Sequence, residues 1–365
     1  MATHDASNLT ARLKSFAFEA PLNEEEKAFA KTVRVRTWAL TVCGCVHAAF
    51  YCRLLTAIRC KVLNEACFTH SWIAKFQVFK SKGGALSVGV LGCGHLGKQL
   101  VVSLLEVAEL SPVNITVSTR SPEKLSNLKY LGVQCFYDNQ RLAASVDVMF
   151  LCCLPSHLIT VSSQIRGYIS ETCIVYSLVT AVPVPRLKQL LAHNTIVRPQ
   201  YSFAGGSWAK LWNIHRNATG VLLNQEIIEV TSPFKDAYSS CVSRKWFEEV
   251  MYSALNVCYL LKVPHRGSLN ILNDLLLGSS HGMEAMGKPS FFVCESFVNT
   301  SCADSLSDNS PFPWFDLSAV SLKDTPLTKF LSLHSRLQYH LSFIYRASML
   351  KKTKVTAVAD DSCEE

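Results

Sequence analysis

Three glycines, Gly92, Gly94 and Gly97, form a G-x-G-x-x-G pattern, the spacing found where a chain binds the pyrophosphate of a dinucleotide. An apolar run precedes the pattern and an amphipathic stretch follows it, as a strand and a helix would. The first glycine permits a tight turn, the second leaves its backbone open to the phosphates, and the third lets the helix lie close to the sheet. The first N–H groups of the helix then face the anion. The residues between the glycines are predicted to add backbone contacts: Cys93, His95 and Leu96. The alternative is a glycine-rich turn that binds no ligand.

The end of the next apolar run carries side chains that can select the cofactor. A site for NAD(H) usually places Asp or Glu here to bind the ribose 2′-hydroxyl. This chain instead has Thr119, Arg120 and Ser121. A guanidinium can stack on the adenine and form paired hydrogen bonds with a 2′-phosphate, whereas a carboxylate would repel that phosphate. The sequence therefore predicts NADP(H) as the cofactor, and Ser121 before Pro122 is also an ordinary helix start.

Short apolar runs alternate with amphipathic stretches through the middle of the chain, which is typical of βαβ units. The predicted strands are residues 86–91, 115–118, 133–136, 146–152, 173–177 and 195–197. The predicted helices are residues 95–109, 122–131, 156–167 and 184–192. With right-handed crossovers these elements give an α/β fold, a Rossmann-type, doubly wound and mostly parallel sheet.

The flanking regions are predicted to be helical. Asn23 followed by three glutamates marks a helix start near the N-terminus. Apolar residues recur at helical spacing over 247–261 and 327–344, and the polar, proline-rich stretch 296–313 is expected to be an exposed loop. The predicted parts are an N-terminal helical extension (1–82), an NADP-binding Rossmann domain (83–206), a mainly helical domain (207–350) and a disordered tail (351–365).

Composition limits the partners and the compartment. The formal charge of +8 is spread along the chain, with one small basic group at 351–354, so a nucleic-acid partner is not expected. Fifteen cysteines without an apolar leader indicate a reducing compartment, so a cytoplasmic protein is expected, with a mitochondrial location as the alternative. No second pair at a ligating spacing accompanies the cysteines at 43, 45, 152 and 153, so no metal site is expected.

Residues 38–52 are uncharged and mostly apolar, but this run of about fifteen residues is shorter than the roughly twenty that span a membrane. It contains His47, and arginines flank it on both sides. The sequence favours a helix packed in the core or lying at a surface. A membrane partner is not expected, and a membrane-peripheral role is the alternative.

Together with the glycine turn, further segments resemble the pyrroline-5-carboxylate reductase family over about residues 86–200. Asn139 matches a cofactor contact of that family. Residues 146–155 are similar to the family's strand that ends in Lys-Pro above the cofactor, with Leu154 in place of the lysine and Pro155 kept. The resemblance implies backbone contacts to the cofactor from the end of this strand: Cys153, Leu154 and Pro155.

Residues 174–181 are similar to the family's strand end beside the nicotinamide, with Ala181 in place of a glycine. The resemblance implies that Val179 and Thr180 contact the cofactor. Members of the family usually dimerise through C-terminal helices, which implies a homodimer and gives residues 207–350 a substrate-binding and dimerisation role.

The resemblance does not extend to the substrate. After Arg198 the chain continues Pro-Gln-Tyr, where the family has Met-Pro-Asn or a variant of it. The family's C-terminal Gly-Ser-Gly-Pro-Ala motif, which holds the imino acid, has no counterpart, and the Gly-Ser-Ser string at 278–280 is a chance match. Fold and cofactor are therefore implied, and proline biosynthesis is not.

Two functions fit these features. The first is an NADP(H)-dependent oxidoreductase that transfers a hydride between the nicotinamide and a small C=N or C=O substrate. The second is a catalytically silent NADP-binding sensor or scaffold, which the missing substrate motif favours. The sequence assigns no catalytic residue, because the reactive group belongs to the cofactor. Candidates for the proton donor are Ser177, Thr180, Tyr201, Lys262 and His265.

Overall fold

The structure, a computed structural model, describes residues 22–67, 84–203, 224–234, 241–278 and 291–350, together with Trp212 and Gly220. The predicted tail 351–365, the first part of the predicted extension and most of the chain between Phe203 and Asn224 lie outside the described residues.

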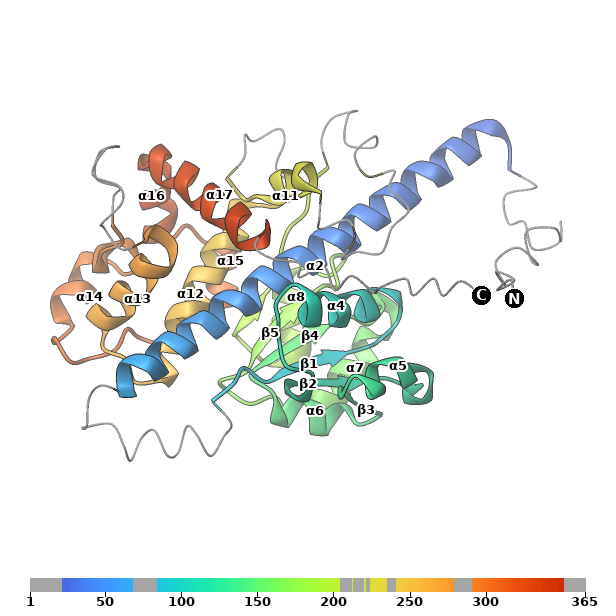
Figure 1. Cartoon of the computed structure of the whole chain (residues 1–365), viewed down its shortest axis with the longest axis horizontal. Coiled ribbons are helices and arrows are strands. Elements are labelled where there is room, and N and C mark those ends of the chain that lie inside the picture. Colours follow the sequence, from blue (N-terminus) through green and yellow to red (C-terminus); the bar gives the residue numbers. More distant parts are fainter. Residues whose placement is uncertain are drawn as a thin grey trace, which may run out of the picture.

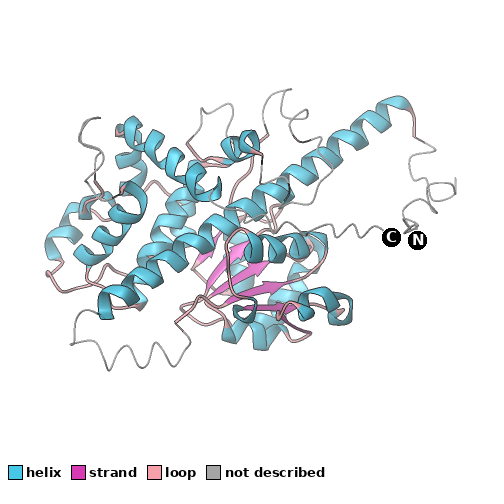
Figure 2. Cartoon of the chain, in the orientation of Figure 1, coloured by secondary structure: helices cyan, strands magenta, loops and turns pink. Residues whose placement is uncertain are grey.

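The core of residues 84–203 is a six-stranded parallel sheet, drawn in magenta in Figure 2. Its strand order is β3-β2-β1-β4-β5-β6. This is the predicted Rossmann-type sheet. Every strand lies within a predicted run, because strands covered on both faces read as continuous apolar runs and are easy to recognise. The strands are β1 (Val88–Leu91), β2 (Ile115–Ser118), β3 (Gln134–Phe136), β4 (Val148–Leu151), β5 (Ile174–Ser177) and β6 (Ile196–Val197).

The helices beside the sheet differ from the prediction in two places. The predicted helix over 122–131 is a 3₁₀ turn, η4 (Pro122–Leu125), followed by the short helix α5 (Ser126–Tyr130). A further helix, α6 (Asn139–Ser145), was not predicted; Asp138 caps it by accepting a hydrogen bond from the Arg141 N–H. The remaining elements are α4 (His95–Glu106), η3 (Pro112–Asn114), η5 (Pro155–His157), α7 (Leu158–Ile165) and α8 (Val184–Leu191).

Helix α2 (Glu24–Cys67) crosses the molecule between its two halves (Figure 1). Its predicted start is confirmed: Asn23 Oδ1 accepts from the Glu26 N–H at 2.8 Å, and Glu26 Oε2 accepts from the Asn23 N–H at 2.9 Å. Of the described helices, α2 alone is long and apolar enough to cross a membrane, but 83% of its most apolar window is buried inside the protein. Residues 38–52 are thus packed in the core, against α4 on one side and α12 (Arg244–Leu260) on the other.

The second half is mainly helical, as predicted, but the stretch 296–313 is not simply an exposed loop. It contains α14 (Thr300–Ser305), and Phe297 and Phe312 are buried within it, because aromatic side chains anchor its polar turns to the core. The predicted periodicity over 327–344 belongs to two helices that divide at His334. The elements are α11 (Gln225–Thr231), α12, α13 (His265–Leu277), η7 (Cys294–Ser296), α14 (Thr300–Ser305), α15 (Leu317–Leu322), α16 (Pro326–Leu333) and α17 (Ser335–Leu350).

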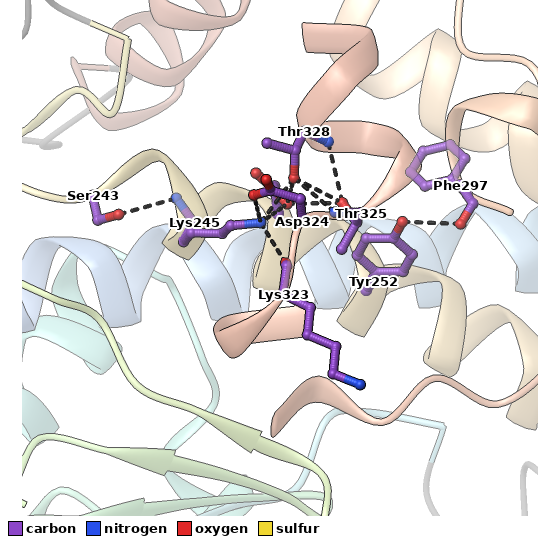
Figure 3. A network of polar contacts seen from close by, with 9 residues as sticks. Ser243, Lys245, Tyr252, Phe297, Lys323, Asp324, Thr325 and Thr328 are labelled. Atoms are coloured by element: carbon purple, nitrogen blue, oxygen red, sulfur yellow. Dashed lines mark hydrogen bonds and ion pairs between the residues drawn. The ribbon is translucent and has the colours of Figure 1, made fainter. Parts of the chain in front are cut away.

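A buried carboxylate ties α12 to the start of α16 (Figure 3). Glu248 is 2% exposed, and its Oε2 accepts hydrogen bonds from Lys245 Nζ at 2.9 Å, Thr325 Oγ1 at 2.8 Å and Thr328 Oγ1 at 2.7 Å. Lys245 Nζ also donates to the Lys323 carbonyl at 2.7 Å. A buried charge is tolerated only when it is paired and hydrogen-bonded, so these contacts fix the turn between α15 and α16.

Candidate functional site

A cavity of about 730 Å³ opens at the carboxyl ends of the parallel strands, at the switch point between β1 and β4. The residues that follow β1, β2, β4 and β5 all reach its wall. Of the residues predicted to bind the cofactor, all except Gly97 line this cavity. They are Gly92, Cys93, Gly94, His95, Leu96, Thr119, Arg120, Ser121, Asn139, Cys153, Leu154, Pro155, Val179 and Thr180.

Each glycine of the turn is required for a different geometric reason. Gly92 has a φ of +92°, and a Cβ there would lie 3.0 Å from the Cys153 backbone N. A Cβ on Gly97 would lie 2.3 Å from the carbonyl oxygen of Gly92, so this glycine keeps the helix against the turn itself. A Cβ on Gly94 would meet nothing within 4 Å and would fill the space beside the backbone. The bare backbone at Gly94 is therefore the cradle that a pyrophosphate requires.

The positive end of the α4 helix dipole lies at the glycine turn. The helix begins at His95, with Gly94 as its N-cap, and its first turn contains no acidic residue. The free N–H groups and the helix dipole at this end favour an anion. The donor set and the open cradle together fit the pyrophosphate of a dinucleotide.

The part of the cavity wall that follows β2 fits a third phosphate, the 2′-phosphate of NADP(H). Arg120 lies on its wall with an exposed side chain, flanked by Thr119 and Ser121 at the end of β2. Among the described residues that line the cavity there is no Asp or Glu. A 2′-phosphate would thus meet a guanidinium and hydroxyls and would not be repelled by a carboxylate, which favours NADP(H).

The side chain of Asn139 is held in a fixed orientation between two elements. Its Oδ1 accepts from Ser118 Oγ at 2.7 Å, and its Nδ2 donates to Gln164 Oε1 at 2.6 Å. Gln164, His157 and Tyr137 also line the cavity, and the sequence did not predict them. Their places depend on how α7 and the end of β3 dock on the sheet, for which the sequence holds no local signal.

Of the five candidates for the proton donor, two line the cavity and three do not. Ser177 is fully buried, and its Oγ accepts from the Val179 N–H at 3.3 Å. Lys262 Nζ lies over the Tyr259 ring, and His265 Nδ1 pairs with the Ser310 carbonyl at 3.1 Å. None of these three lines the cavity, whereas Thr180 and Tyr201 do.

The hydroxyl of Tyr201 is engaged by a histidine of α2. His47 Nε2 lies 2.8 Å from the Thr231 carbonyl, which can only accept, so Nε2 carries the ring proton. Burial lowers the pKa of His47 to about 4, so the ring is neutral at pH 7. Its Nδ1 therefore accepts from the Tyr201 hydroxyl at 3.0 Å. Thr180 is left as the candidate whose side chain is exposed in the cavity.

Arg198, the residue directly after β6, contacts the loop at 178–183 between β5 and α8, which we call the Thr180 loop. Its guanidinium donates to the Thr180 carbonyl, and its backbone N–H donates to Glu249 Oε2 at 3.1 Å. Glu249 is 1% exposed, and burial raises the pKa of its carboxyl to about 8. The buried carboxyl of Glu249, which is not among the described residues that line the cavity, thus helps to fix the backbone that follows β6.

Glu249 makes stability depend on pH. Because its folded pKa of about 8 lies above the ordinary 4.5, the folded state holds the proton more tightly than the unfolded chain does. Its stabilising effect is complete below pH 4.5 and is lost as pH rises through 8. We expect the free energy of unfolding to fall by up to roughly 1.4 kcal/mol per pH unit in this window. Glu249→Gln should flatten the slope in urea melts at pH 6, 7 and 8, and an unchanged slope would contradict this role.

Helix α2 forms the roof of the cavity. Thr37, Leu40 and Thr41 lie on one helix face and line the cavity opposite the strand ends. The Trp38 ring lies 6.3 Å from the His95 ring, between centroids, so the roof also touches the glycine turn. No role for the N-terminal region was predicted. The i, i+3, i+4 spacing of residues 37, 40 and 41 indicates that they share one helix face. It does not indicate which part of the molecule that face covers.

Comparison with known proteins gives the family. The family model described as "NADP oxidoreductase coenzyme F420-dependent" matches residues 87–180. The NADP-dependent oxidoreductase domain-containing protein 1 of Mus musculus is 37% identical over 336 residues, which cover 91% of this chain and 91% of that protein. The chain therefore belongs to the family of the NADP-dependent oxidoreductase domain-containing protein 1. NADP(H) is the cofactor of the family, as the sequence predicted.

The resemblance to the pyrroline-5-carboxylate reductases is also confirmed by sequence similarity. Pyrroline-5-carboxylate reductase of Escherichia coli K12 is 29% identical over 108 residues, which cover 29% of this chain and 40% of the reductase. The reductase of Coxiella burnetii matches over 53% of this chain and 77% of its own, with 19% identity and a TM-score of 0.30. The Plasmodium falciparum reductase with NADP bound matches over 72% and 95%, with 12% identity and a TM-score of 0.28.

Proposed function

We propose that this chain is an NADP(H)-dependent oxidoreductase that transfers a hydride between the nicotinamide and a small C=N or C=O compound. The observation that supports it is the continuous cavity, which runs from Arg120 past the bare backbone at Gly94 to Thr180 and Tyr201. The cofactor supplies the reactive hydride, and the chain supplies binding, orientation and a polar group beside the reacting bond.

The residues of the chain divide this work along the cavity. The N–H groups at the start of α4 bind the pyrophosphate, and Arg120 binds the 2′-phosphate. The Thr180 loop, supported by Arg198, orients the nicotinamide end. Roof residues of α2, together with Leu178 and Val179, exclude water from that end, which strengthens any hydrogen bond made there. The hydroxyl of Thr180 donates a hydrogen bond to the nitrogen or oxygen on which charge develops.

A silent NADP-binding sensor or scaffold is the second candidate. Two observations favour it. Leu154, in the place of the family's lysine, is 63% exposed on the cavity wall and offers no polar group. The Tyr201 hydroxyl proton is directed to His47 and away from a substrate. Such a protein would bind NADPH with the same selectivity and would not oxidise it.

A substrate-panel assay that follows NADPH absorbance separates the two. We expect the purified full chain to oxidise NADPH with at least one cyclic imine, 2-oxo acid, ketone or aldehyde. Thr180→Val should then lower kcat by about 100-fold, the usual effect of removing one donor to a developing charge, while the Kd for NADPH changes little. Thr180→Ser keeps the hydroxyl and is the matched control. NADPH binding without turnover by any compound would support the sensor.

A further inference from the structure

The first three turns of α2 lie outside the hydrophobic core of the described structure, and the first side chains of the helix that pack against that core are Val35 and Trp38. Figure 1 shows this end of the helix projecting beyond the two halves of the molecule, and we call residues 22–34 the arm. In the arm no residue is buried, and the first buried side chain is Ala39. A single helix of this length is marginally stable in water, because most helical stability comes from packing an apolar face.

The arm carries such an apolar face. Phe29 is 71% exposed and Val33 is 44% exposed. The residues that share this face recur with the spacing 4-3-4-3-4, the pattern of two helices that wrap around each other. They are Leu22, Glu26, Phe29, Val33, Arg36 and Leu40.

When two copies of this face are placed antiparallel, apolar residues meet apolar residues and opposite charges meet. If two arms lie antiparallel and cross between Phe29 and Val33, Phe29 faces the partner's Val33. Glu26 then faces the partner's Arg36, and Leu22 faces the partner's Leu40. In a parallel pair, by contrast, Glu26 would face the partner's Glu26, and like charges would meet. Charge therefore selects the antiparallel arrangement, which is the symmetric contact of a twofold dimer.

The geometry points to a homodimer in which the arm of each copy pairs antiparallel with the arm of the other. The pair buries Phe29 and Val33 and places opposite charges on either side of them. Leu40, which ends the face, also lines the cofactor cavity. The partner's Leu22 thus lies at the mouth of the cavity, so each copy helps to close the site of the other. This dimer does not depend on the proposed catalytic activity.

The first test is the mass of the full chain by sedimentation equilibrium at micromolar concentration. We expect a dimer. Phe29→Glu with Val33→Glu should give a monomer at the same concentration, since the introduced carboxylates of the two copies would face each other at the centre of the pair, where burial and like charge both disfavour them. The matched control is Tyr339→Glu with Phe343→Glu on α17, whose side chains are 72% and 54% exposed. Dissociation by the α17 variant alone would overturn the arm pairing and support the dimer through C-terminal helices that the resemblance implies.

The second test uses charge reversal and separates pairing with a second copy from cover by residues 1–21 of the same chain. Glu26→Arg alone and Arg36→Glu alone should each raise the dimer Kd at least tenfold, because like charges then face each other. An equimolar mixture of the two single variants should form the mixed dimer with nearly the original affinity. Loss of the Glu26 cap contact is common to the single variant and the mixture, so it cannot produce the rescue. A wild-type monomer, or no rescue on mixing, would overturn the proposal.

Discussion

Gly94→Val is expected to abolish NADPH binding while the protein remains folded. The added side chain enters the space beside the backbone that the pyrophosphate would occupy, and a Cβ at this position meets no protein atom within 4 Å. The φ of Gly94 is −76°, which any residue adopts, so only a small loss of helix capping is expected. We expect the Kd for NADPH, measured by calorimetry, to rise by at least about 100-fold, or about 2.8 kcal/mol.

The neighbouring glycine provides the control for this variant. Gly97→Ala places a Cβ 2.3 Å from the Gly92 carbonyl oxygen, so it should destabilise the fold as well as the site. Thermal melts by circular dichroism should therefore separate the two variants, with Gly94→Val close to the wild type and Gly97→Ala clearly lower. If folded Gly94→Val bound NADPH as tightly as the wild type, the glycine turn would not be the phosphate site.

Arg120→Ala is expected to remove most of the preference for NADPH over NADH. A hydrogen bond to a charged group contributes about 1.5–3 kcal/mol, so the Kd for NADPH should rise roughly 10- to 100-fold. The Kd for NADH, which has no 2′-phosphate, should change by less than about threefold. Arg120→Lys keeps the charge and loses the paired geometry, so its effect should be intermediate.

Arg166→Ala is the matched control for the charge itself. Arg166 is an exposed arginine at the end of α7 and is not among the described residues that line the cavity. Its removal lowers the net charge by the same amount and should leave the ratio of the two affinities unchanged. Equal affinities for NADPH and NADH in the wild type would contradict the proposed role of the end of β2.

The parts of the site that depend on local backbone could be predicted. The glycine turn lies within ten consecutive residues, and the buried strands of a parallel sheet are continuous apolar runs with turns between them. Helix α6 escaped prediction because it has seven residues, of which only Leu142 and Ala143 are buried, too few to show a helical period. The hydrogen bond between His47 and Tyr201 joins residues 154 positions apart, and no sequence pattern in either segment predicts it.

The roof of the cavity shows the same limit. The sequence indicates that residues 38–52 form a helix that must cover its apolar side chains. It does not show that the surface covered includes both α4 and α12, which lie far apart in the chain. The position of α2 depends on contacts with both halves of the molecule, and these contacts form only when both halves have folded.

This arrangement has a consequence for how the chain is made. Cys43 Sγ lies 3.3 Å from Cys241 Sγ, so an early helix completes its packing only with a segment 198 residues later. At a synthesis rate of about 5–20 residues per second, the side of α2 that packs against the later segment stays uncovered for roughly 10–40 s on the ribosome. We expect nascent chains to need chaperones over this interval. A fragment that stops after β6 should aggregate instead of folding as an independent nucleotide-binding domain.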